Sequence, residues 1–333
     1  MSEADPMAVR RYLLGRHMEP EIIDWKYFDP GFNRGQERGV VWVRENQVAG
    51  FLGLIPFRLE NDRFRADCAW SCDWSVDASQ GGGMGLLLVK RAREFYDGIF
   101  NLGGNENTLQ IFPRLADRTV ADAGISLVLP LRFGSIVARL PPGFVKRVIS
   151  RQQKLQQIPL RWVRRGVTAV TIEPGVSPRM LSVAAARPET DWRPVYGAGF
   201  FDWQFGRCPA ITSWSCWISS ESPPRTASLL WRSRSSKNLW RFVFCGETHD
   251  PEKIETLTAA MISFAYQRGC MALLTIASHR QSDLIRFLRR RGLMRHGRLP
   301  FFAMRGRCAE LPAEDFAALS YLDADLAYRF EQA

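Results

Sequence analysis

A short glycine-rich segment, from Gln80 to Gly85, separates two stretches of different periodicity and restricts the folds open to this chain. Residues 63–76 alternate bulky and small side chains, as a β-strand does, whereas residues 86–96 place apolar side chains at helical spacing. A strand that ends in glycines and leads into a helix presents unpaired backbone N–H groups at the positive end of the helix dipole. The pattern predicts a phosphate-binding turn; a glycine turn without a ligand is the alternative.

The glycine segment excludes two common phosphate motifs. No Lys-Ser or Lys-Thr pair follows the glycines, as a P-loop requires, and their spacing is not that of the dinucleotide fingerprint. The segment therefore remains an indication of phosphate binding that belongs to neither of these two motifs.

Strand and helix patterns recur in both halves of the chain. In the second half, Asp250 and Pro251 are typical of a helix start, Gly269 is typical of its end, and further strand and helix patterns follow at 271–277 and 282–291. Both halves thus end in the order helix, strand, helix, strand. We expect an α/β fold with a mixed sheet and a degenerate internal duplication.

The charge distribution favours anionic partners. The chain has 45 Lys and Arg against 34 Asp and Glu, a net charge of +11, and residues 134–166 contain no acidic residue. Three interpretations of that stretch stay open: a solvated linker, a membrane-surface element and a nucleic-acid contact. Because no nucleic-acid recognition module is present, we expect no nucleic-acid partner. The sequence carries no indication of the oligomeric state.

The first 16 residues lack the continuous apolar core of a signal peptide, so we expect a cytoplasmic protein, with peripheral attachment to the inner membrane as an extension of that expectation. The seven cysteines form an odd number without a disulfide pattern, which predicts free thiols. No histidines and carboxylates have metal-ligand spacing, so no metal is expected.

The strand, glycine segment and helix resemble the GNAT superfamily of acyl-CoA-dependent N-acyltransferases. The family's loop reads [Q/R]-x-x-G-x-[G/A] after a strand that ends in Asp-x-x-Val, and this chain has Asp73-x-x-Val76 followed by Gln80-x-x-Gly83-x-Gly85. The resemblance implies two GNAT-like domains, each a mixed twisted sheet flanked by helices. The first would span residues 1–135, a basic amphipathic connector 136–185, and a degenerate second domain 186–333.

The same resemblance implies that acyl-CoA is the cosubstrate and that its pyrophosphate binds at the glycine segment. The residues expected to hold it are Val76, Gln80, Gly81, Gly82, Gly83, Met84, Gly85 and Asn105. A later family motif is only partly met, because Phe112 stands where many members have a tyrosine that protonates the leaving thiolate. A phenyl ring has no proton to give, so this step needs another group, an unassisted thiolate, or an inactive site.

Acyl transfer to an amine needs a base. Asp73, on the small face of its strand, is the first candidate, although a carboxylate that anchors a neighbouring segment is an equally good interpretation. His279, at the start of an Arg-rich helix, is the second candidate, and Glu106 and Asp67 are weaker ones.

The leading hypothesis is therefore an acyl-CoA-dependent N-acyltransferase that acts on an amphiphilic amine, such as a lipid or sphingoid-type acceptor, at a membrane surface. Two alternatives remain: an amino-sugar N-acetyltransferase of polysaccharide or cell-envelope synthesis, and a catalytically silent CoA-binding scaffold.

Overall fold

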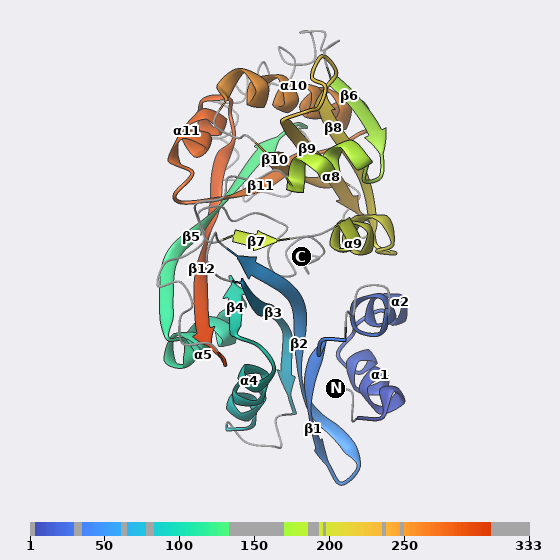
Figure 1. Cartoon of the computed structure of the whole chain (residues 1–333), viewed down its shortest axis with the longest axis vertical. Coiled ribbons are helices and arrows are strands. Elements are labelled where there is room, and N and C mark those ends of the chain that lie inside the picture. Colours follow the sequence, from blue (N-terminus) through green and yellow to red (C-terminus); the bar gives the residue numbers. More distant parts are fainter. Residues whose placement is uncertain are drawn as a thin grey trace, which may run out of the picture.

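The computed structural model describes residues 4–29, 35–60, 65–77, 83–132, 170–185, 193–195, 198–234, 238–246 and 250–307. These residues form one continuous 12-stranded sheet with helices on both faces (Figure 1). The observed fold is the mixed α/β fold expected from the sequence.

The first half begins with helices and continues as strands that alternate with helices. Its elements are α1 (Pro6–Leu14), α2 (Pro20–Ile23), the π-helix η1 (Asp24–Phe28), β1 (Gly39–Arg44), β2 (Gln47–Glu60), β3 (Arg65–Val76), α4 (Met84–Phe95), β4 (Gly98–Leu102), α5 (Glu106–Leu115) and β5 (Arg118–Pro130).

The second half has a similar order. Its elements are β6 (Val170–Pro174), α8 (Pro178–Ala185), β7 (Arg193–Val195), α9 (Ala198–Phe201), the π-helix η3 (Asp202–Gly206), β8 (Ile211–Ile218), β9 (Thr226–Ser233), β10 (Leu239–Gly246), α10 (Pro251–Gln267), β11 (Ala272–Ser278), α11 (Ser282–Arg290) and β12 (Met294–Arg305).

The two halves exchange their last strands. The sheet order is β1-β2-β3-β4-β12-β5-β11-β10-β9-β8-β6, with β7 paired to β2. The final strand of the second half, β12, thus lies between β4 and β5, while β5 of the first half lies between β12 and β11. Each half needs a strand from the other to complete its sheet, so the predicted halves share one sheet. The boundaries proposed for them remain a prediction.

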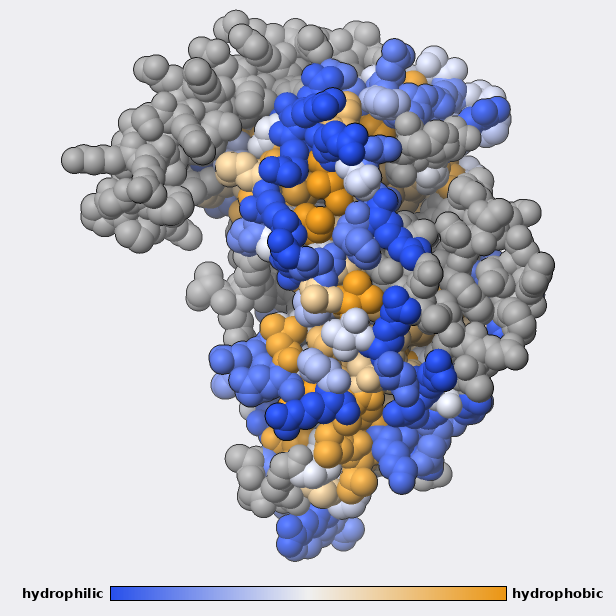
Figure 2. All heavy atoms as spheres, turned by 90° about the vertical axis from the view of Figure 1, so that its left-hand side faces the viewer, coloured by the Kyte–Doolittle hydropathy of each residue, from blue (hydrophilic) through white to orange (hydrophobic). Residues whose placement is uncertain are grey.

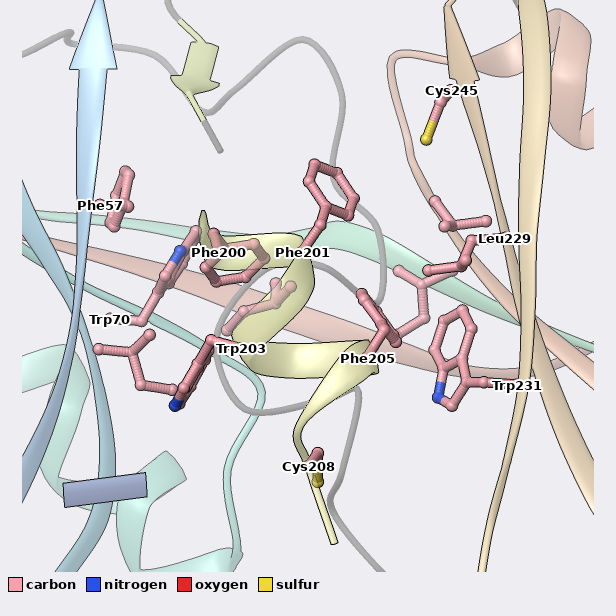
Figure 3. Close-up of a cluster of buried hydrophobic side chains, with 14 of the residues drawn as sticks. Phe57, Trp70, Phe200, Phe201, Trp203, Phe205, Cys208, Leu229, Trp231 and Cys245 are labelled. Atoms are coloured by element: carbon pink, nitrogen blue, oxygen red, sulfur yellow. The ribbon is translucent and has the colours of Figure 1, made fainter. Parts of the chain in front are cut away.

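The helices separate by face. The first face carries α1, α2, η1, α8, α9 and η3, and the second carries α4, α5, α10 and α11. Aromatic side chains of α9 and η3 fill the space between the two halves on the first face. Figure 3 shows Phe200, Phe201, Trp203 and Phe205 between side chains of the first half of the sheet and side chains of the second half. This core contains side chains from both halves, so each half buries its apolar side chains against the other.

The two π-helices form a nearly symmetric contact across the halves. Trp25 of η1 and Trp203 of η3 stack with ring centroids 4.5 Å apart and an interplanar angle of 12°. The indole N–H of Trp25 donates to the carbonyl of Trp203 at 2.7 Å, and the indole N–H of Trp203 donates to the carbonyl of Trp25 at 2.9 Å. The sequences around them also correspond, since each tryptophan follows an aspartate, Asp24 or Asp202. These reciprocal contacts support the internal duplication.

Several expected elements are confirmed. Asp250 caps α10 by accepting hydrogen bonds from two backbone N–H groups of its first turn, and α11 and β11 lie within about a residue of the expected bounds. The strand β5 is the last strand of the order helix, strand, helix, strand expected for the first half, although the sequence pattern gave no bounds for it. The predicted connector at 136–185 lies largely outside the described residues; only β6 and α8 are seen in it.

Among the described residues, no helix combines the length and apolar character needed to span a membrane, and no group of three or more His, Cys, Asp or Glu side chains could hold a metal ion.

The described cysteines are all buried free thiols: Cys68, Cys72, Cys208, Cys216, Cys245 and Cys270. Burial raises the pKa of the Cys208, Cys216 and Cys270 thiols to about 12, since desolvation disfavours the thiolate.

We therefore expect native Cys308→Ser protein to release no chromophore from Ellman's reagent within minutes at pH 8. The same variant unfolded in guanidinium should show all six remaining thiols, out of seven in the wild-type chain. Stoichiometric labelling of the native variant would contradict the burial.

Candidate active site

The strands β3 and β4 are paired at one end and diverge at the other. They run parallel and pair only where Cys68 to Trp70 lie beside Gly98 to Phe100. Beyond Trp70, β3 continues to Val76 without a ladder to β4, so backbone groups on both strands face the space between them. The space beyond the carboxyl ends of two parallel strands is a common position for ligand sites in α/β folds, so this point of the sheet is the candidate site.

Asn101 spans the point of divergence. Its side-chain amide donates to the backbone carbonyl of Ser71 at 3.3 Å and to the Ser71 hydroxyl at 3.2 Å. Asn101 is only 5% exposed, and its Oδ1 has no hydrogen-bond partner among the described residues. A buried acceptor without a donor costs free energy, so Oδ1 is suited to an amide N–H of a ligand lying between the strands.

A β-bulge changes the direction of β3 at Asp73. Gly53 of β2 pairs with Cys72 and Phe51 pairs with Ser75, so Asp73 and Trp74 together face one residue of β2. Asp73 has a φ of +45°, which few non-glycine residues adopt. The bulge overturns the expectation that side chains simply alternate along this strand: Trp74 packs on the α4 face, and Asp73 turns toward η1. A strict period of two cannot anticipate an inserted residue.

Asp73 lies in a cluster with two residues of η1. Its Oδ2 accepts hydrogen bonds from the ammonium of Lys26 and from the hydroxyl of Tyr27. The Lys26 side chain is 2% exposed and that of Asp73 is 26% exposed. The carboxylate therefore lies between the buried ammonium of Lys26 and the solvent. Tyr27 Oη also lies 3.6 Å from Cys72 Sγ. The carboxylate therefore anchors η1 and is itself partly exposed to solvent.

The start of α4 is open. Gly83 is the N-cap residue, and its backbone has ordinary negative φ. A Cβ built there would meet nothing within 4 Å, whereas a Cβ at Gly85 would lie 2.6 Å from the Trp74 ring. A phosphate site requires accessible N–H groups at the start of a helix, and the open space at the Cβ position of Gly83 is compatible with one at the start of α4. Gln80, Gly81 and Gly82 lie outside the described residues.

Three other expected site residues have identifiable positions. Asn105 is the N-cap of α5, and its Oδ1 accepts from the N–H of Thr108 at 2.9 Å, a structural role. Phe112 is 1% exposed and packs edge-on against Trp74, with ring centroids 5.3 Å apart. Val76 ends β3 and packs with the α4 core.

Among the described residues, the second half has no counterpart of the polar cluster. In the second half, the parallel pairing of β10 with β11 ends at Arg241, and the third residue after it is Phe244. In the first half, the pairing of β3 with β4 ends at Trp70, and the third residue after it is Asp73. Gln204 takes the place of Lys26 in the corresponding π-helix; it is fully buried, and its amide has no hydrogen-bond partner among the described residues. The carboxylate and ammonium pair is thus a property of the first half.

His279 lies far from Asp73. It follows β11, and three strands, β4, β12 and β5, separate β11 from β3. At about 4.8 Å per strand, this is roughly 19 Å across the sheet. The backbone N–H of His279 donates to the carbonyl of Ala123 at 2.8 Å, and its ring Nδ1 lies 3.3 Å from the same oxygen. The structure does not bring the two candidate catalytic residues together.

Sequence reasoning missed Lys26, Tyr27 and Asn101. The repeated Asp-Trp pair, Asp24-Trp25 and Asp202-Trp203, was a signal for the two π-helices, and Asn101 is the one amide within an otherwise apolar strand.

The fold has relatives among solved structures, although no protein-family model and no curated protein sequence matches this chain. A GCN5-related N-acetyltransferase from Anabaena variabilis is 12% identical, with a TM-score of 0.52, over 90% of this chain and 71% of that one. A tandem GNAT protein from the clavulanic acid biosynthesis pathway is 12% identical, with a TM-score of 0.50, over 81% of this chain and 84% of that one. Saccharomyces cerevisiae N-myristoyltransferase, solved with bound myristoyl-CoA, is 12% identical, with a TM-score of 0.54, over 87% and 71% of the two chains.

The chain thus has the GNAT fold. Its exchanged strands and the paired π-helices correspond to two GNAT-like halves in one polypeptide, as in a tandem GNAT protein.

Proposed function

We propose that this protein is an acyl-CoA-dependent N-acyltransferase whose acyl-CoA site lies in the first half. The observation that carries the proposal is the divergence of β3 and β4 beside the open N-terminus of α4, within a GNAT fold. In the second half, Phe244 and Gln204 replace the polar cluster, which favours a single catalytic centre.

The residues present fit acyl-CoA. The first N–H groups of α4, at Gly83 and Met84, would hold the pyrophosphate, and the unpartnered Oδ1 of Asn101 would accept from an amide of the pantetheine arm. Bound acyl-CoA supplies the activated acyl group as a thioester.

Asp73 is the proposed proton acceptor. As the amine nitrogen bonds to the acyl carbon and the carbon–sulfur bond breaks, the amine proton passes to the Asp73 carboxylate, which Lys26 and Tyr27 hold in position. The CoA thiolate leaves without a tyrosine at position 112, since Phe112 is buried among aromatic rings.

The proposed acceptor is an amphiphilic amine at a membrane surface. Support comes from the acid-free basic stretch at 134–166 and from the likeness to a structure that binds a long-chain acyl-CoA. Charge reversal at Arg147 and Arg151 should weaken sedimentation with anionic liposomes. Unchanged sedimentation would remove the membrane part of the proposal.

Mass spectrometry of ligands that co-purify with the protein tests the donor, because the acyl chain length is read directly. Amines are then screened by release of free CoA thiol. Acyl-CoA binding with amine-dependent thiol release would support the proposal, and absence of any CoA binding would refute it.

A CoA-binding scaffold without activity is the second candidate, and buried Phe112 favours it. Tight CoA binding without thiol release across a broad amine panel would identify the scaffold.

A further inference from the structure

A groove of about 550 Å³ lies along α11 in the second half. Its walls are five residues of α11 together with Ile125 of β5 and His279, which lies three residues before the helix. The α11 residues are Ser282, Ile285, Arg286, Arg289 and Arg290. Figure 2, which faces the side of the molecule bearing α11 and β5, shows hydrophobic surface bordered by hydrophilic surface.

The groove residues of α11 form one face of the helix. They occupy positions i, i+3, i+4, i+7 and i+8 from Ser282, whereas Leu284, Phe287 and Leu288 of the same helix pack into the core. Burial of the apolar stripe therefore fixes which side chains line the groove, and the arginines are held there by the orientation of the helix.

Few of the described carboxylates pair with the arginines of this face. Arg286 pairs with Asp283 at 3.3 Å, an exposed contact of small energy. Arg289 and Arg290 have no carboxylate partner within ion-pair distance among the described residues. Three arginines line the groove together with Ile125 and Ile285, so the groove combines positive charge with apolar side chains.

This chemistry suits one kind of ligand. Arginine binds phosphate oxygens in a bidentate manner, and a dianion is matched by several guanidinium groups. The two isoleucines would contact an apolar chain or ring attached to the phosphate.

We propose that the α11 groove is a binding site for a phosphate monoester group attached to an apolar chain. The described residues of the second half include no counterpart of the carboxylate and ammonium pair, and the groove gives this half a role in ligand binding. This site goes beyond the proposed acyl transfer and does not depend on it.

Calorimetric titration with hexyl phosphate tests the site. The Arg289→Gln/Arg290→Gln variant should bind hexyl phosphate at least about tenfold more weakly than wild type, because two charged donors are lost. The matched control is Arg44→Gln/Arg65→Gln, which removes the same charge from exposed strand residues. Methyl phosphate should bind wild type more weakly than hexyl phosphate, since it lacks the chain that contacts the isoleucines. All variants should keep the wild-type thermal unfolding midpoint.

Sedimentation with phosphatidic acid vesicles in phosphatidylcholine separates two sources of the phosphate. Vesicle binding that is lost in the groove variant and kept in the control identifies a lipid headgroup. Unchanged vesicle binding with weakened hexyl phosphate binding identifies a soluble ligand.

Hexyl phosphate affinity within twofold of wild type in the groove variant would overturn the proposal, as would an equal loss in the control. Binding that survives in the groove variant but disappears in Gly83→Asp would place the phosphate at the glycine segment and equally overturn it. The first two of these results do not bear on acyl-CoA binding or turnover, whereas loss of binding in Gly83→Asp would assign phosphate binding to the site proposed for acyl-CoA.

Discussion

Replacement of Asp73 by asparagine is expected to lower kcat/KM for acyl transfer by roughly 100- to 10,000-fold, the usual contribution of a general base. Asparagine tolerates the positive φ at this position, so the bulge itself should persist. The variant should also unfold more easily, by about 3–5 kcal/mol, because the buried ammonium of Lys26 loses its carboxylate partner. Thiol release with an identified amine and thermal unfolding measure the two effects.

The double variant Lys26→Gln/Asp73→Asn separates catalysis from stability. Glutamine is the residue at the corresponding position of the second half, where a π-helix buries it, so the substitution is compatible with this fold. Removing both charges should recover most of the lost stability while activity stays low. If activity returns together with stability, Asp73 is only an anchor for η1 and the proposed base is wrong.

Replacement of Gly83 by aspartate is expected to weaken CoA binding by about 100-fold or more, equivalent to roughly 2.7 kcal/mol. The new carboxylate would lie at the N-terminus of α4, where it would repel the pyrophosphate. The same carboxylate is a favourable N-cap, and its Cβ would meet nothing within 4 Å, so stability should be unchanged or slightly higher. Calorimetric titration with CoA measures the affinity.

Two further variants serve as controls for the glycine segment. Gly83→Asn has the same shape without the charge and should keep CoA affinity within a few-fold of wild type. Gly85→Ala should instead destabilise the fold by about 1–3 kcal/mol, because its Cβ would lie 2.6 Å from the Trp74 ring. Equal CoA affinity in wild type and Gly83→Asp would remove the phosphate from this site.

The sequence was most informative where local chemistry sets the structure. The start of α10 is set by the Asp250 cap and Pro251, and α11 is set by its own apolar stripe. Because each of these signals acts within a single helix, their spacing sufficed to predict both helices. The glycine segment and the residues before it were enough to identify a GNAT-like region, which the fold comparison confirms. The alternation along β3 failed at Asp73, because a bulge depends on the pairing with β2 and leaves no mark in a period of two.

By itself, then, the sequence determined the class of fold, the duplicated order of elements and the candidate phosphate turn, since each follows from local propensity and periodicity. Only the tertiary structure decided which side chains meet. It placed Lys26 and Tyr27 against Asp73, separated Asp73 from His279 by the width of three strands, and inserted β12 into the sheet of the first half. These contacts join residues far apart in the chain, and the packing of whole faces, which no local pattern records, fixes them.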